Sequence, residues 1–217
     1  MKKTIILIFA IVILFSFKQI SKSTLETDVL ETVNSARKYM YVDSMGKCLI
    51  IQNSFPRGIK YTDPNGKEYS KLLFWTRITN ETEKPLELKI DFPEDSYEVP
   101  SLPGRHFKIL LPSDTLALDK EPLPDYGMTN LKSFLDKNIH KPSSLKRTIN
   151  PKESSGFYVV ILFDIEVPGP TRTGLVIKGQ NLLYKVTRYA GKQGVSLIDE
   201  KEINCGSINL KNLVRQK

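Results

Sequence analysis

Residues 74–90 read FWTRITNETEKPLELKI, and this stretch decides the fold class. It contains most of an apolar strand expected over 71–79. A polar connection through Pro85 follows, and residues 86–92 then alternate apolar and charged side chains. Such alternation is typical of a strand with one buried face. The stretch therefore predicts two strands of an antiparallel β-structure.

The same two-residue period continues in both directions along the chain. Residues 157–163 are apolar on both faces and are expected to form a central strand covered on each side. Asp63-Pro64-Asn65-Gly66 predicts a tight turn. Further strands are expected at 48–52, 107–111, 174–178 and 181–188, with shorter candidates at 195–198, 202–205 and 208–210. Short strands at roughly ten-residue spacing predict a mainly β protein built as an antiparallel β-sandwich.

One helix is expected inside the β domain. Residues 129–139 carry Leu131, Phe134 and Leu135 at helical spacing, and Thr129 is placed to cap the first turn. The helix lies in a longer segment, 113–142, which we interpret as a helical insertion. The β domain itself is expected to span 47–217.

A second helical segment is expected at residues 24–46. Leu25, Val29 and Val33 recur at helical spacing there, after a serine or threonine that could cap the helix. Residues 38–41 either finish this helix or begin a strand.

The opening stretch resembles a hairpin of bacterial immunoglobulin-like domains. The shared pattern is an apolar strand ending in Thr79-Asn80, a polar turn, Pro85-Leu86 and an alternating strand. Residues 149–153, with Pro151 leading into the strand at 157, are similar to a later turn and strand of those domains. The overall layout also resembles small secreted proteins of Bacteroidota-type genomes. The resemblance implies an immunoglobulin-like sandwich and an extracytoplasmic compartment, and it implies no activity.

The first 23 residues have the layout of a secretory signal peptide. Lys2 and Lys3 precede a run of apolar residues that is closed by Lys18. The run is shorter than the 17 or so residues that a spanning helix needs, which favours cleavage near Thr24 over an uncleaved anchor. We expect an extracytoplasmic protein, periplasmic or secreted, that contacts a membrane only through this segment.

Charge and motifs exclude several function classes. Removing residues 1–23 takes Lys+Arg from 32 to 28 against 24 acidic residues, so the net charge falls from +8 to +4. This small excess gives no reason to expect nucleic-acid binding. The densest basic stretch, 141–152, is interpreted as a solvated loop, with an anion site as the alternative. No cofactor is expected, because the chain has no phosphate-binding loop.

The two cysteines allow two interpretations. In an oxidising compartment Cys48 and Cys205 could form a disulfide that ties the first core strand to the C-terminal segment. Alternatively, both are buried thiols in adjacent strands. No metal site is expected, since the chain has no CxxC pair and only two histidines.

Two kinds of surface site are candidates. Trp75 follows Phe74 on a strand and should point to the opposite face, beside Arg77, where it could stack on a sugar or anchor a partner. The alternative is that the 129–139 helix or the N-terminal helix covers Trp75 in a second small core. Ser44 and Thr115 each follow Asp and precede an apolar residue, as at Bacteroidota O-glycosylation sites.

We expect a non-enzymatic binding or assembly module that contacts an envelope protein or a glycan through a strand edge or the Trp75 face. The alternative is an extracytoplasmic hydrolase with carboxylates from separate loops. A hydrolase should bring at least two candidate residues together in a deep pocket. These candidates are Asp91, Glu94, Asp95, Glu98, His106 and His140. A purely structural envelope component would show neither a pocket nor a free edge.

Overall fold

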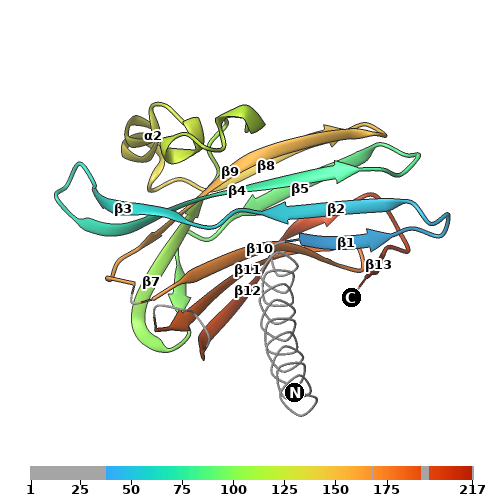
Figure 1. Ribbon diagram of the computed structural model, residues 1–217. Coiled ribbons are helices and arrows are strands. Elements are labelled where there is room, and N and C mark those ends of the chain that lie inside the picture. Colours follow the sequence, from blue (N-terminus) through green and yellow to red (C-terminus); the bar gives the residue numbers. More distant parts are fainter. Residues whose placement is uncertain (1–37, 168, 192–195, 217) are drawn as a thin grey trace, which may run out of the picture. The chain divides into compact units, whose positions relative to one another are not determined.

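The computed structural model describes residues 38–167, 169–191 and 196–216. Within them, two antiparallel sheets make up most of the structure (Figure 1). The large sheet has the order β13 (Val214–Arg215), β1 (Lys38–Val42), β2 (Cys48–Asn53), β4 (Glu68–Asn80), β9 (Glu153–Phe163), β7 (Leu102–Leu110) and β6 (Tyr97–Val99), and β3 (Arg57–Thr62) also pairs with β4. The small sheet has the order β10 (Thr171–Lys178), β11 (Asn181–Ala190), β12 (Ser196–Ile208), β5 (Leu86–Phe92) and β8 (Ser143–Ile149). The mainly β prediction is confirmed.

The long strand β4 organises the large sheet. One of its edges pairs with β9 along eleven residues, from Ser70 to Asn80. The opposite edge pairs with β3 over its first half and with β2 over its second half. Its side chains alternate between two apolar environments, which is why this strand reads as apolar on both faces.

The main core lies between the two sheets. Phe74 and Ile161 of the large sheet pack there with Leu88, Leu182 and Tyr184 of the small sheet, and all five are buried. Burial of each such side chain contributes about 1.5–3 kcal/mol to folding. This core holds the sheets together and is the basis of the sandwich-like arrangement.

A second core covers the other face of the large sheet. The insertion contributes η1 (Leu118–Lys120), η2 (Pro124–Gly127) and α2 (Leu131–Asn138). Leu131 and Leu135 of α2 pack there with Leu73, Trp75 and Tyr158 of the sheet. The predicted helix is confirmed, but its predicted cap is wrong. Asn130, with a φ of 60°, occupies the N-cap position and makes no side-chain capping bond.

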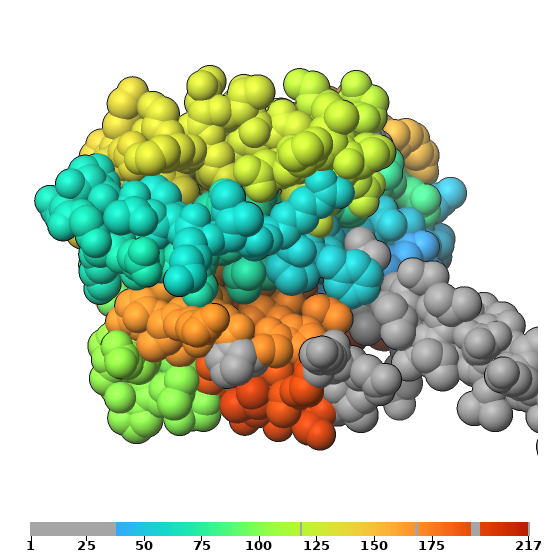
Figure 2. Space-filling view, turned by 60° about the vertical axis from the view of Figure 1, so that its left-hand side comes forward, coloured from blue at the N-terminus to red at the C-terminus, as the bar shows by residue number. Residues whose placement is uncertain are grey.

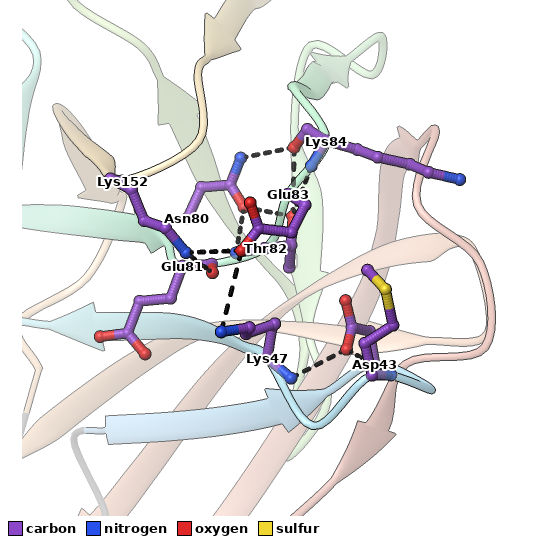
Figure 3. A network of polar contacts seen from close by, with 9 residues as sticks. Asp43, Lys47, Asn80, Glu81, Thr82, Glu83, Lys84 and Lys152 are labelled. Carbon is purple, nitrogen blue, oxygen red and sulfur yellow. Dashed lines mark hydrogen bonds and ion pairs between the residues drawn. The ribbon is translucent and has the colours of Figure 1, made fainter.

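Residues 74–90 connect the two sheets and do not form a hairpin within one sheet. β4 belongs to the large sheet and β5 to the small sheet, so the chain passes from the large to the small sheet between them. It passes back to the large sheet between β8 and β9, which pair with β5 and β4 respectively. At the corner Asn80 is fully buried, and its amide nitrogen donates to the carbonyls of Lys84 and Ile149, both at 2.9 Å. Thr82 donates its hydroxyl to the Asn80 amide oxygen at 2.7 Å (Figure 3).

Charged side chains close the outside of the same corner. The Lys152 ammonium donates to the Glu81 carbonyl at 2.7 Å and to the Glu83 carboxylate at 3.0 Å (Figure 3). Lys47 approaches the same carboxylate to 3.8 Å. The hydrogen bond from Lys152 lowers the pKa of Glu83 below its ordinary value. The polar turn that the sequence shows is therefore a bonded corner between the two sheets.

The sequence prediction for the basic stretch is wrong. Within the basic stretch 141–152, residues 143–149 form strand β8 and not a solvated loop, because Leu145 and Ile149 are buried on one face. Residues 38–42 form strand β1, so the alternative that 38–41 begin a strand is confirmed and the expected helical segment does not extend to residue 46. The rest of that segment up to residue 37, and the expected signal peptide, lie outside the described residues.

The three short C-terminal strand candidates also need correction. Residues 196–208 form one continuous strand, β12, which pairs with β11 and, at its end, with β5.

In the described residues, no helix is long and apolar enough to cross a bilayer.

Candidate functional site

The outer edge of β3 is the feature with the clearest capacity to bind another chain. All six residues of β3 pair with β4, from Arg57 opposite Leu73 to Thr62 opposite Glu68. Among the described residues, no other strand pairs with β3. In Figure 2 this segment, in cyan, forms a band on the surface between the yellow-green insertion and the orange strands. An unpaired strand edge offers backbone donors and acceptors to a further strand.

Local sequence explains why β3 lies flat against β4. A Cβ atom at Gly58 would stand 2.6 Å from a Leu72 methyl carbon and 2.9 Å from the Lys71 carbonyl oxygen. Only glycine therefore permits this close approach. Beyond β3, the Asp63 carboxylate accepts hydrogen bonds from the backbone amides of Asn65 and Lys67, which fixes the predicted turn.

Side chains at the two ends of β3 attach it to the insertion. Arg57 donates to the Glu121 carbonyl at 2.9 Å and lies 4.1 Å from the centre of the Tyr126 ring. Tyr61 donates its hydroxyl to Asp136 at 2.9 Å. Burial, with the Asp136 hydrogen bond, raises the pKa of Tyr61 above 10. β3 is thus a rigid edge held at both ends.

Ile59 lies between these two anchors on the same face of β3, and it is largely uncovered by the described residues. Its side chain is 66% exposed, the largest value among the large hydrophobic residues of the described chain. A flat strand edge with an exposed apolar residue at its centre is a site at which strands add.

The edges formed by β10, β13 and β6 are occupied or short. On β10, the backbone amide of Leu175 donates to the Asn53 side chain at 3.2 Å, and that of Ile177 donates to the Tyr41 hydroxyl at 2.7 Å. These side chains come from the large sheet and occupy donors that an added strand would use. The outermost strands β13 and β6 have only two and three residues. β3 has none of these protective features.

A concavity of about 210 Å³ lies on the opposite face of the β3–β4 hairpin from Ile59. Lys60 and Ser70, which are direct cross-strand partners, line it together. Its charged lining consists of Glu68, Asp164, Glu166 and Lys60. Lys60 stands 3.9 Å from Glu68, and both side chains are well exposed. Three carboxylates against one ammonium make this concavity acidic.

A wider concavity of about 450 Å³ lies over β5, β8 and β12. Lys89 stands directly opposite Lys146 there, and Glu87 and Asn209 are beside them. The side-chain amide of Asn209 already makes two hydrogen bonds: its oxygen accepts from the Glu87 backbone amide, and its nitrogen donates to the Pro85 carbonyl. The basic stretch therefore contributes to an open polar surface of mixed charge.

Trp75 is not on the surface. Its side chain is 5% exposed and contacts Tyr126 edge to face, with ring centres 6.4 Å apart. The expectation of an outward-facing Trp75 is wrong, and the alternative of a second core beneath the 129–139 helix is confirmed. Arg77 shares that face farther along β4 and donates to the Ser154 hydroxyl at 3.4 Å.

The two cysteines lie on strands of different sheets, and both thiols are free. Cys48 is half-buried at the start of β2. Cys205 is buried in the main core, and its thiol lies 3.4 Å from the Leu182 carbonyl. Burial raises the pKa of Cys205 to about 12. The structure thus contains neither the expected disulfide nor the alternative of thiols in adjacent strands.

Both predicted O-glycosylation residues are exposed. Ser44 lies in the turn between β1 and β2, and Thr115 accepts a hydrogen bond from Arg147 at 3.0 Å. Their modification remains a prediction. Asn80-Glu81-Thr82 also fits the N-glycosylation sequon, but the Asn80 side chain is fully buried and hydrogen-bonded in the folded chain.

The candidate hydrolase residues are dispersed. Glu98 and His106 are cross-strand partners on β6 and β7, but Glu98 accepts a hydrogen bond from the Gly104 backbone. Asp95 forms an ion pair with Lys108, and His140 is exposed after α2. Neither concavity contains any of the six candidates.

The β3 edge was missed by sequence reasoning, although a signal was present. Arg57, Ile59 and Tyr61 alternate with Gly58 and Lys60 directly before the predicted turn. That alternation is the pattern of a short strand.

No protein-family model, curated protein or solved structure matches this chain. Within the residues that the structure describes, no three His, Cys, Asp or Glu side chains form a group able to hold a metal ion.

Proposed function

We propose that this chain is a non-enzymatic binding module that takes up an extended segment of a partner protein as an additional strand beside β3. The observation that carries the proposal is the unpaired six-residue edge with Ile59 exposed at its centre. A protein partner is favoured over a glycan, because only a polypeptide can match the spacing of backbone donors and acceptors along a strand.

The physical basis of binding is main-chain hydrogen bonding. Every second residue of β3 turns its N–H and C=O groups away from β4, so an added strand could form a short ladder. Each hydrogen bond contributes a net of about 0.5–1.5 kcal/mol. Contact with Ile59 would add the burial of apolar area. The anchors at Arg57 and Tyr61 keep the edge preorganised, which reduces the entropy cost of association.

The proposed setting is the cell envelope. It rests on the signal-like segment 1–23, and the partner would then be an envelope or extracellular protein. The immunoglobulin-like assignment is also proposed. Its support is the pair of connections, β4–β5 and β8–β9, that cross between the sheets as they do in Greek-key sandwiches. β10, β11 and β12 lie side by side in the same order as in the chain, and this arrangement departs from the Greek-key order.

Site-specific photo-cross-linking in the producing cell tests the proposal. A benzophenone amino acid replaces Ile59 in one variant and Leu197, which is 61% exposed in the small sheet, in a matched control. A discrete adduct with another polypeptide is expected from position 59 and not from position 197. Absence of an adduct at 59, or equal adducts at both positions, would contradict strand addition at β3.

A further inference from the structure

We infer that the segment added to β3 carries lysine or arginine on one face and apolar residues on the other. This inference deepens the proposed function and depends on it. It concerns which sequences the edge selects, and it follows from the different environments on the two faces of the β3–β4 hairpin.

The first face is acidic. An added strand would lie about 4.8 Å from β3, and its alternate side chains would share the face of Lys60 and Ser70. The adjoining concavity is lined by Glu68, Asp164 and Glu166. One carboxylate oxygen of Asp164 already accepts a hydrogen bond from the His106 backbone amide, but Glu166 has no bonding partner in the described chain. A long cationic side chain from the added strand could reach the near rim of this concavity, at Lys60 and Glu68, where the excess of carboxylates in the lining would attract it.

The second face has an apolar centre at Ile59. Side chains of the added strand at the other alternate positions would lie beside Ile59, between Arg57 and Tyr61. A charged residue there would lose hydration against an apolar neighbour, whereas valine or isoleucine would bury area. The preferred occupant is therefore a basic and apolar alternating segment of another protein.

Binding of short synthetic peptides tests this selection. Three peptides of roughly eight residues alternate valine with lysine, threonine or glutamate, so that all can form a strand. Affinity for the full chain is measured by fluorescence anisotropy at low and high salt. We expect the lysine peptide to bind about tenfold more tightly than the glutamate peptide, with the preference shrinking as salt rises.

Charge variants locate the source of the preference. In the double variant Glu68→Gln and Glu166→Gln, the lysine and glutamate peptides should bind within about threefold of each other. The control Glu87→Gln removes an exposed carboxylate of the small sheet and should leave the tenfold preference intact. Unfolding by urea verifies that each variant is folded. Both exchanges are conservative and lie at exposed positions, so misfolding would not explain a loss of the preference for the lysine peptide.

The outcomes separate the two proposals. If all three peptides bind equally and Ile59→Lys abolishes binding, strand addition stands and the charge selection is overturned. If none binds, the proposed function itself fails. Self-association of the chain that Ile59→Lys abolishes would assign the edge to a second copy and would also overturn the inference.

Discussion

The Asn80 side-chain amide donates a hydrogen bond to the Ile149 backbone carbonyl at 2.9 Å, which joins the end of β4 to the end of β8. Both chain segments change sheets at this point. One fully buried amide thus holds together the two connections on which the relation of the sheets depends. The same amide also satisfies the Lys84 carbonyl and accepts from Thr82.

Replacement of Asn80 by alanine should therefore destabilise the whole fold. It removes the donor to the Ile149 and Lys84 carbonyls and the oxygen that accepts from Thr82, and only the bond between Thr82 and the Lys84 carbonyl remains. We expect a loss of about 2–4 kcal/mol in the free energy of unfolding. Urea denaturation measures the loss. Asn181→Ala, at an exposed position of β11, is the matched control and should change stability by less than about 0.5 kcal/mol. Equal effects of the two variants would contradict the role of the corner.

A buried ion pair predicts the acid sensitivity of the fold. Arg188 donates from Nε to one oxygen of Asp199 at 3.0 Å, and their side chains are 3% and 7% exposed. Burial alone would raise the pKa of Asp199, but hydrogen bonds from Arg188 and Ser101 lower it below its ordinary value of 3.8. Asp199→Asn would leave Arg188 buried without its counter-charge, and we expect a loss of about 3–5 kcal/mol at pH 7.

The sign of the pH dependence follows from the lowered pKa. The unfolded chain binds the proton at Asp199 more readily than the folded chain, so this pair stabilises the fold above the ordinary pKa. The contribution is lost as the pH falls through the lowered pKa of the folded state. Between pH 5 and pH 2, wild-type stability in urea should consequently fall more steeply than that of Asp199→Asn. Parallel pH profiles would contradict this.

The fluorescence of Trp75, the single tryptophan of the chain, should depend on how the insertion packs against the large sheet. Leu135 is fully buried against the same face of the large sheet. Leu135→Ala should lower the free energy of unfolding by about 2–5 kcal/mol and shift Trp75 emission to the red. Lys137→Ala, at an exposed position of the same helix, should do neither. Unchanged emission in Leu135→Ala would mean that the insertion does not cover Trp75.

Thiol chemistry distinguishes free cysteines from a disulfide. Because burial raises the pKa of Cys205 to about 12, its reactive thiolate is scarce at pH 8. Iodoacetamide should therefore modify the half-buried Cys48 first in the native protein, and both cysteines after denaturation without reductant. Peptide mass spectrometry measures the two yields. A denatured, unreduced chain that takes up no label would show a Cys48–Cys205 disulfide instead.

Local patterns predicted those elements whose surroundings are encoded in their own residues. The strands around Phe74 and Leu88 and the helix through Leu135 follow from periodicity alone. The alternation in β8 is obscured because Lys146 and Arg147 are both charged, although Arg147 lies on the face of Leu145 and Ile149. The sheet change at Asn80 depends on contacts with Ile149, far along the chain, which no local pattern contains.

The candidate site was less predictable for the same reason. A sequence can show that Ile59 belongs to a strand, but exposure of that strand's outer edge depends on where every other strand pairs. Likewise, the alternation at Phe74 and Trp75 gave their opposite directions, whereas the cover over Trp75 comes from a distant insertion. The edge and its acidic concavity therefore appear only once the sheets are assembled.

Amide hydrogen exchange with the lysine–valine peptide tests strand addition at β3 most directly. In the free chain, the outward amides of Arg57–Thr62 should exchange rapidly, because they lack a partner among the described residues. Saturating peptide should slow their exchange at least about tenfold and leave β10, whose amides are occupied by Asn53 and Tyr41, unchanged. Peptide binding that protects another part of the chain and leaves β3 exchange unaltered would contradict the account.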